Sequence, residues 1–207
     1  HAKEIAKPGY HEVFLEAYQI KAQLTATTRV GFHQYTYPTS AKSHILIDLA
    51  TFLGPSDTQK SFVKQVNEHR LEGYVIMAPS LRRPKVLPVY FVIDFDKPFA
   101  QIGAWRKGVL EDFKNQVEGE KVGVYVSFPT KANEQRLMKV AISNVSTEQA
   151  ALNLPTELPH WDFDRVVEES HSEWDAWLGR IKVEGKNETD KKRFYTDLFH
   201  ALQGRRI

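Results

Sequence analysis

Short apolar segments alternate with turn-forming residues from residue 10 to about residue 144, at a spacing too close for long helices. Ile20, Ala22, Leu24 and Ala26 alternate with polar residues, which is the period-2 pattern of a half-buried strand. Further candidate strands cover 30–38, 45–49, 73–78, 86–95, 99–105, 121–128 and 137–143. Turn residues separate them at 54–57, 79–80, 97–98 and 129–130. About nine short strands without crossover helices predict a mainly β fold, an antiparallel sandwich or barrel, and argue against a parallel α/β sheet.

The pattern changes near residue 145. Ser146 or Thr147 can cap a short helix that runs through Asn153, and Pro155 and Pro159 are expected to interrupt it. We therefore expect a β-sandwich domain over residues 1–145 and a helical linker over residues 146–207.

Two longer helices are expected in the linker, each with an aromatic stripe. The first carries apolar residues at helical spacing from Phe163 to Ile181, with Asp162 or Asp164 as its cap and Gly179 at its end. The last starts near residue 189 and is expected to bury Phe194, Tyr195, Leu198, Phe199 and Leu202. These stripes must be covered, either by the sandwich or by a helical domain that the chain does not contain.

Composition excludes several classes of function. The 207 residues include no cysteine, which removes disulfides, thiolate nucleophiles, thiolate zinc sites and iron–sulfur clusters. A formal net charge of +2 gives no electrostatic case for nucleic acid. No apolar run approaches the ~18 residues of a membrane span. The chain opens at His1 without a methionine or a signal peptide and stops abruptly after residues 204–207, so we expect both ends to be truncated.

Few residues in this sequence carry the spacing of a catalytic or metal site. None of the histidines pairs with another at the i, i+4 spacing of two ligands on one helix face; they are His1, His11, His33, His44, His69, His160, His171 and His200. The pairs Asp94/Asp96 and Asp162/Asp164 have the spacing for calcium or acid–base work, but a turn and helix caps account for them better. Ser43 and His44 with Asp48 lack the glycine-flanked turn of a nucleophile. We therefore assign no catalytic, metal or substrate-binding residue from spacing.

Two non-catalytic functions stay open. In one, Trp105 or Tyr90 forms the stacking platform of a carbohydrate-binding module, because an aromatic ring suits the apolar face of a sugar. In the other, the helical aromatic face around Trp177 and Phe199 makes the chain an interaction domain. The basic loop at 81–85 and the two glycosylation motifs at Asn144 and Asn187 support neither.

Several segments together resemble the family 92 glycoside hydrolases, which are bacterial calcium-dependent exo-acting α-mannosidases. The segments are His1-x-x-Glu4-x-Ala6-x-Pro8-Gly9-Tyr10, Leu24-Thr25-Ala26-Thr27-x-Arg29-x-Gly31-x-His33-x-Tyr35-Thr36-x-Pro38, Ile45–Leu49, Ser146-x-Glu148-Gln149-Ala150-x-x-Asn153-Leu154, Trp174 with Leu178, Ile181 and Glu184-Gly185, and Phe194-Tyr195-Thr196-x-Leu198-x-His200. Their order and spacing hold across nearly the whole chain. His11, Lys186 and Phe199 depart from the family pattern without affecting the fold.

The resemblance implies an antiparallel β-sandwich followed by helices that lead into an α/α barrel, absent from this chain. It implies an enzyme that releases mannose from α-mannosides such as mannan or N-glycans, in the periplasm or secreted from a bacterium. The implied catalytic carboxylates and calcium ligands belong to the barrel, downstream of Ile207, so no catalytic or metal residue is carried over. The chain alone is expected to be inactive, with the missing catalytic domain and a carbohydrate as its partners.

Overall fold

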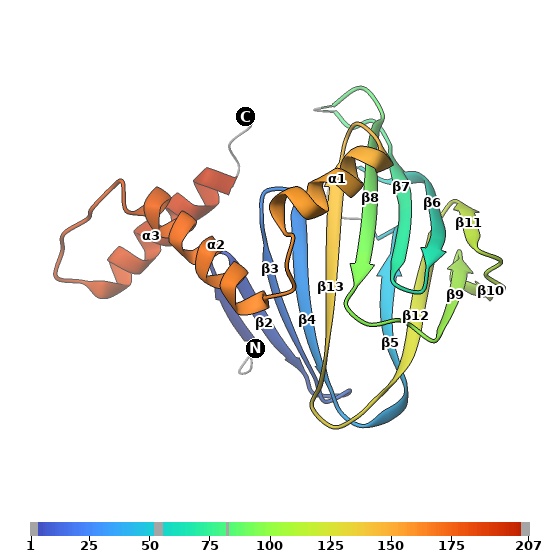
Figure 1. The fold of residues 1–207 in the computed structure, drawn as a ribbon. Helices are drawn as coiled ribbons and strands as arrows, with labels where there is room; N and C mark the ends of the chain where they lie inside the picture. Colours follow the sequence, from blue (N-terminus) through green and yellow to red (C-terminus); the bar gives the residue numbers. More distant parts are fainter. Residues whose placement is uncertain (1–3, 52–55, 82, 204–207) are drawn as a thin grey trace.

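Two antiparallel sheets pack face to face, and three helices follow them at the C-terminal end (Figure 1). The computed structural model describes residues 4–51, 56–81 and 83–203. The strands are β1 (Glu4–Lys7), β2 (Tyr10–Leu15), β3 (Ile20–Ala26), β4 (Val30–Tyr37), β5 (Ser40–Asp48), β6 (Thr58–Asn67), β7 (Arg70–Met77), β8 (Leu87–Phe95), β9 (Gln101–Arg106), β10 (Val109–Glu111), β11 (Gln116–Gly119), β12 (Val122–Thr130) and β13 (Glu134–Ser143). The helices are α1 (Thr147–Glu157), α2 (Phe163–Leu178) and α3 (Glu188–Gln203). This confirms the expected mainly β sandwich with helices after it.

The large sheet has nine strands in the order β1-β2-β3-β4-β13-β8-β7-β6-β11, and the small sheet has the order β10-β9-β12-β5. Every strand pair is antiparallel. The sequence pattern predicted about nine strands and named no candidate at β1, β2, β6, β10 or β11. In β6 the core side carries Ser61 and Val63, both fully buried, while the opposite side carries the exposed Lys60 and Lys64 with Phe62 between them. A serine on the core face breaks the apolar alternation on which the prediction depends.

The large sheet separates two apolar cores. Side chains such as Phe91 and Ile93 pack between the two sheets, together with Val122, Val124 and Val126 of the small sheet. On the other face Phe32 and Val92 pack against the helices. The helices contribute the buried side chains of Ala150, Leu154, Leu158, Phe163 and Val166. Burial on both faces explains why central strands such as β8 have a continuous apolar run.

The first residues of α1 and α2 are capped as predicted, but α1 ends later than predicted. Ser146 Oγ accepts from the N–H of Gln149 at the start of α1, and Asp162 Oδ1 accepts from the N–H of Arg165 at the start of α2. The expectation that Pro155 interrupts the first helix was wrong, because α1 continues to Glu157. The packing of Ala150 and Leu154 on the large sheet holds the last turn, although proline removes one helical hydrogen bond.

Helix α3 is only partly enclosed. None of its side chains is buried, so the expectation that it buries its aromatic stripe was wrong for this chain. Its main neighbour is α2, where the ring of Phe199 lies 4.7 Å from that of Trp174 between centroids. Figure 1 shows α3 beside α2, on the side away from the small sheet.

Candidate functional site

A buried lysine fixes the junction between α1 and α2 on the large sheet. Lys139 of β13 is 4% exposed, and its Nζ donates to the carbonyl of Leu158 at 2.9 Å. The same ammonium lies 4.0 Å from the ring centroid of Trp161. Burial lowers the pKa of Lys139 below its usual value, partly opposed by the carboxylate of Asp94. The cation–π contact and the charged hydrogen bond together hold the segment that joins the two helices.

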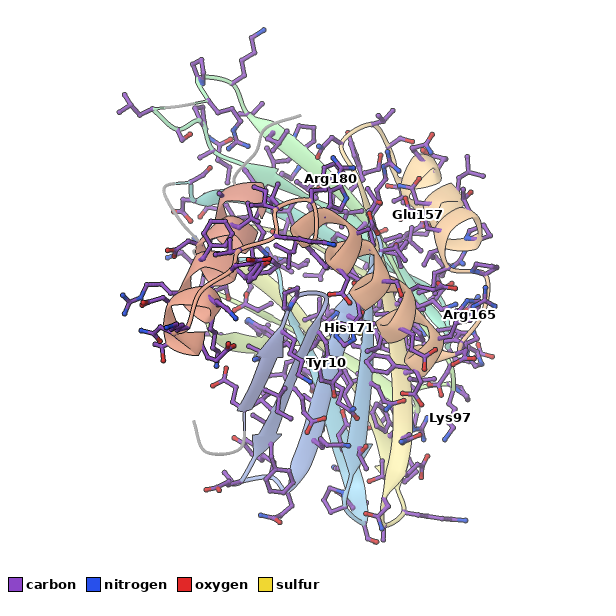
Figure 2. The ribbon with its side chains drawn as sticks, turned by 90° about the vertical axis from the view of Figure 1, so that its left-hand side faces the viewer. Tyr10, Lys97, Glu157, Arg165, His171 and Arg180 are labelled. Atoms are coloured by element: carbon purple, nitrogen blue, oxygen red, sulfur yellow. The ribbon has the colours of Figure 1, made fainter. Side chains whose placement is uncertain are left out.

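The C-terminal end of α1 is attached to the sandwich by Glu157. Its carboxylate accepts from Thr27 Oγ1 at 2.6 Å and from the backbone N–H and the guanidinium of Arg29, each at 2.8 Å. Burial opposes the charge, but the hydrogen bonds from Thr27 and Arg29 outweigh it and hold the pKa of Glu157 below its ordinary value. Figure 2 shows Glu157 at the sandwich side of α1.

A polar network lies beneath α2 on the N-terminal strands. Tyr10 donates to Glu12 at 2.5 Å, and Gln23 donates to Tyr10 at 2.8 Å and accepts from Gln34. Figure 2 labels Tyr10 and His171 close together, where α2 crosses the first strands, and their rings meet edge to face at 6.3 Å. Burial and the Glu12 hydrogen bond raise the pKa of Tyr10. The contact of His171 with Tyr10 helps to orient α2 on the sheet. The polar groups of this network bond one another, so none of them forms a pair of acid and base facing an open cleft.

The outer surface of α2 and α3 is aromatic and half exposed. Arg180 covers the ring of Trp177 at 3.8 Å, and Phe194 and Tyr195 meet edge to face. The Tyr195 hydroxyl donates to the carbonyl of Ile181 at 3.0 Å, which ties the segment between the helices to α3. Ile181, predicted within the second helix, lies beyond its end at Leu178. Trp177 is 39% exposed and the rings of Phe194 and Tyr195 are partly buried, so the helix pair keeps aromatic surface that the described residues do not fully enclose.

The aspartate pairs have structural partners. Arg70 donates to both oxygens of Asp94, at 2.6 and 2.7 Å, and Asp96 accepts from the N–H of Leu137. Asp162 caps α2, and Asp164 lies in its first turn. Across residues 4–51, 56–81 and 83–203, no group of three or more His, Asp or Glu side chains is placed to hold a metal ion.

The histidines do not converge, and each described one has a separate environment. His11 bonds Glu4, His33 bonds Tyr35, His44 meets the ring of Tyr125, His69 bonds the Phe95 carbonyl, His160 accepts from the Asp162 N–H, His171 meets Tyr10 and His200 meets Phe199. His1 lies outside the described residues, as do the turn residues 52–55, Arg82 and residues 204–207. Ser43 points inward to Thr130, whereas His44 points outward, so these two cannot act together.

The two candidate stacking platforms lie on different sheets. Trp105 is on the outward side of β9 in the small sheet, opposite Gly123. Tyr90 shares the helix-facing side of β8 with Val92, and its ring meets that of Tyr74 at 6.2 Å. In the basic loop, Arg83 donates to Ser56 and to the carbonyl of Ala78, which is a structural role. No helix of the described chain is long and apolar enough to cross a membrane.

A family model described as the glycosyl hydrolase family 92 N-terminal domain matches residues 1–143. The chain belongs to glycosyl hydrolase family 92. A second model, the catalytic domain of the same family, matches residues 149–207.

Solved and curated relatives agree with this family. A family GH92 α-mannosidase from Bacteroides thetaiotaomicron superposes with a TM-score of 0.86 at 29% identity, over 97% of this chain and 27% of its own. A family GH92 inverting mannosidase from the same species shares the fold at a TM-score of 0.83 and 22% identity, over 98% of this chain and 26% of its own. An uncharacterized secreted glycosidase of Arthroderma benhamiae is 22% identical over 95% of this chain and 28% of its own length. The chain therefore spans about a quarter of the length of these relatives.

Several contacts of this family 92 chain have no signal in the sequence. Lys139 lies among apolar residues of β13, and the strand pattern alone suggests a lysine that faces solvent. The pattern does not reveal that Trp161 and Leu158, far along the chain, pack against its ammonium group. Gly103 and Gly123 read as weak points of strands, although each lies beneath an aromatic ring. Only the pairing register, which a sequence does not contain, places each glycine opposite its ring.

Proposed function

We propose that this chain forms the sandwich and the beginning of the catalytic domain of an enzyme that releases mannose from α-mannosides. The observation that supports this is the likeness, at 29% identity and a TM-score of 0.86, to a solved α-mannosidase across nearly the whole chain. The division at residues 145 and 146 belongs to the proposal, and the two family matches, which end at 143 and begin at 149, support it. The substrate class is an α-linked mannoside such as mannan or an N-glycan, with α-1,2 linkage as the first candidate.

The reaction we propose is inverting hydrolysis. One carboxylic acid protonates the leaving glycosidic oxygen while a carboxylate on the opposite face of the ring activates water. The aspartate pairs of this chain do not suit those roles, because Asp94 is held by Arg70 and Asp162 caps a helix. We therefore place both catalytic carboxylates beyond Ile207, in the continuation of the catalytic domain.

The contribution of this chain is to hold that domain in position. Lys139 and Glu157 fix α1 and its junction with α2 on the large sheet, and α2 carries α3 beside it. The family match beginning at residue 149 supports the proposal that α3 is the first helix of the barrel. Its aromatic side chains, which lie half exposed here, would then face the helices that follow.

Calcium dependence is part of the proposal, with its ligands outside this chain. The residues present do not fit the ion, because no group of three or more acidic or histidine side chains gathers anywhere in the described residues. Oxygen-rich coordination by six to eight ligands is what calcium requires. We also propose that the enzyme is exported, to the periplasm or the cell exterior of a bacterium, which the description of a fungal relative as secreted supports in its general sense.

Mannose release from α-1,2-linked mannobiose tests the proposal. The assay compares the 207-residue chain with a longer product that continues past Ile207, each with calcium and with a chelator, and maltose serves as the control substrate. We expect release by the longer product alone, with loss under chelation. No release from any α-linked mannobiose by the longer product would contradict the activity. Release by the 207-residue chain would contradict the placement of the catalytic carboxylates.

A further inference from the structure

The outer face of the small sheet presents two aromatic side chains that lie across glycines. Trp105 of β9 and Tyr125 of β12 point outward, and the residues directly opposite them are Gly123 and Gly103. A Cβ added to Gly123 would lie 1.9 Å from Cζ2 of Trp105, and one added to Gly103 would lie 2.3 Å from Cζ of Tyr125. Each ring therefore fills the place of the missing side chain and lies over the glycine backbone, and both residues are partly exposed.

A hollow of about 500 Å³ adjoins the indole of Trp105. Asp48, Lys107 and Glu120 are among the residues that line it. Lys107 Nζ lies 3.0 Å from Glu120 Oε2, and this lysine lowers the pKa of the Glu120 carboxyl. Asp48 accepts from the Ala50 N–H and the Thr51 hydroxyl, which orients its carboxylate beside the hollow. The hollow thus combines an apolar ring surface with one oriented carboxylate, Asp48, and an exposed ion pair between Lys107 and Glu120.

A second hollow, of about 440 Å³, adjoins Tyr125. It lies at the start of β9, and Gln101 of that strand, Gln65 of β6 and Glu68 just after β6 supply polar groups there. The exposed side chain of Leu46 lies opposite Tyr125 in the register of β5 and β12, and the ring of His44 meets that of Tyr125 at 5.8 Å. The two rings lie on the outer face of the small sheet, which we call the Trp105 face, and one hollow adjoins each ring.

We propose that the Trp105 face binds a neutral glycan chain, with one sugar stacked on the indole of Trp105 and another at Tyr125. The C–H face of a pyranose suits an aromatic ring, and its hydroxyls suit the paired acceptors and donors at the rim. Charge selects among occupants. Lys107 and Lys121 balance Asp48 and Glu120 around the first hollow, so neither an anionic nor a cationic polymer gains a net electrostatic attraction there.

This binding is separate from hydrolysis. The helices that lead toward the catalytic domain pack on the far side of the large sheet, whereas the Trp105 face lies on the outside of the small sheet (Figure 1). Only the choice of an α-mannan chain as the first probe rests on the proposed function. A glycan bound here would keep the enzyme on its polymeric substrate.

Calorimetric titration of the 207-residue chain with α-linked mannotetraose tests the proposal, with cellotetraose and an acidic oligosaccharide as other probes. The test variants are Trp105→Ala and Tyr125→Ala. The matched control is Trp177→Ala, which removes a more exposed indole, 39% exposed, from α2. Thermal melts followed by circular dichroism show whether each variant keeps the fold. We expect Trp105→Ala to weaken binding by about tenfold or more, Tyr125→Ala by several-fold, and Trp177→Ala to leave it unchanged.

Indole N–H resonances keep the proposal testable if Trp105→Ala fails to fold. The Trp105→Phe variant retains a ring over Gly123 and assigns the Trp105 signal in the spectrum of the wild-type chain. Ligand should shift the Trp105 signal and leave that of Trp177 in place. Absence of binding to any neutral glycan, or binding that persists in Trp105→Ala, would overturn the proposal. A dimer that dissociates on Leu46→Lys would assign this face to a second copy and would also overturn it. Failure of mannose release, by contrast, leaves the binding result untouched.

Discussion

His33 couples the stability of the sandwich to pH. Its ring lies on the same side of β4 as Tyr35 and Tyr37, and its Nδ1 lies 2.9 Å from the Tyr35 hydroxyl. The residues opposite it on the neighbouring strands are Leu24 and Met138, which provide no counter-charge. Burial lowers the pKa of His33 from 6.5 to about 4. The folded chain therefore keeps this ring neutral where the unfolded chain takes up a proton.

The sign and size of the effect follow from that pKa difference. Between pH 6.5 and about 4 the unfolded state binds more protons, so the free energy of unfolding decreases as pH falls. At ~1.36 kcal/mol per pH unit the contribution lost by pH 5 is about 2 kcal/mol, and its limit below pH 4 is about 3 kcal/mol. All of it is present above pH 6.5.

Urea unfolding of wild type and His33→Gln at pH 7 and pH 5 measures this contribution. The substitution removes the titrating group and keeps a side chain able to bond Tyr35, so we expect the wild type to lose about 2 kcal/mol more than the variant between the two pH values. Tyr35→Phe is the matched control, because burial, which sets the pKa, remains. Equal losses in wild type and His33→Gln would refute the reasoning.

Three further substitutions test the attachment of the helices. Lys139→Met keeps the apolar part of the side chain but leaves the Leu158 carbonyl without its donor, so we expect the free energy of unfolding measured in urea to fall by about 1–3 kcal/mol. An unchanged free energy would contradict the role of Lys139 in holding the junction between α1 and α2. Glu157→Gln removes the charge that Thr27 and Arg29 stabilise, and we expect the free energy of unfolding to fall by about 1–3 kcal/mol at pH 7. This loss should shrink as pH falls below the ordinary glutamate pKa, because the wild-type carboxylate then becomes protonated. A loss that does not depend on pH would contradict the ionic role. Asp162→Ala removes the cap of α2 and should cost about 0.5–2 kcal/mol, whereas Asp162→Asn should retain most of the stability and serves as its control.

Much of the fold follows from local patterns in the sequence. The alternation in 20–26 places β3 with its bounds, and the dipeptide Lys97-Pro98 ends β8 where it was expected. Ser146 and Asp162 cap their helices because short polar side chains satisfy the first free N–H groups. These features depend on interactions within a few residues, which a sequence displays directly.

Features that depend on distant residues could not be predicted in the same way. The short edge strands β10 and β11 have three and four residues and exist through their pairing with β9 and β6. Helix α1 continues past Pro155 to Glu157 because its buried side chains pack on the large sheet. The Trp105 face requires the register that sets two rings opposite two glycines. Trp105 itself was a candidate from the sequence, but Tyr125 and the glycines opposite the two rings were not.

Hydrogen exchange in α3 tests most directly the claim that this chain ends in a surface built for the catalytic domain. Peptides from α1 and α3 are followed by mass spectrometry in the 207-residue chain and in a longer product that continues past Ile207. Because α3 has no buried side chain and α1 packs on the large sheet, we predict fast exchange in α3 and slow exchange in α1 of the shorter chain. The longer product should protect α3 and leave α1 unchanged. Protection of α3 equal to that of α1 in the shorter chain, or no gain in the longer product, would contradict the account.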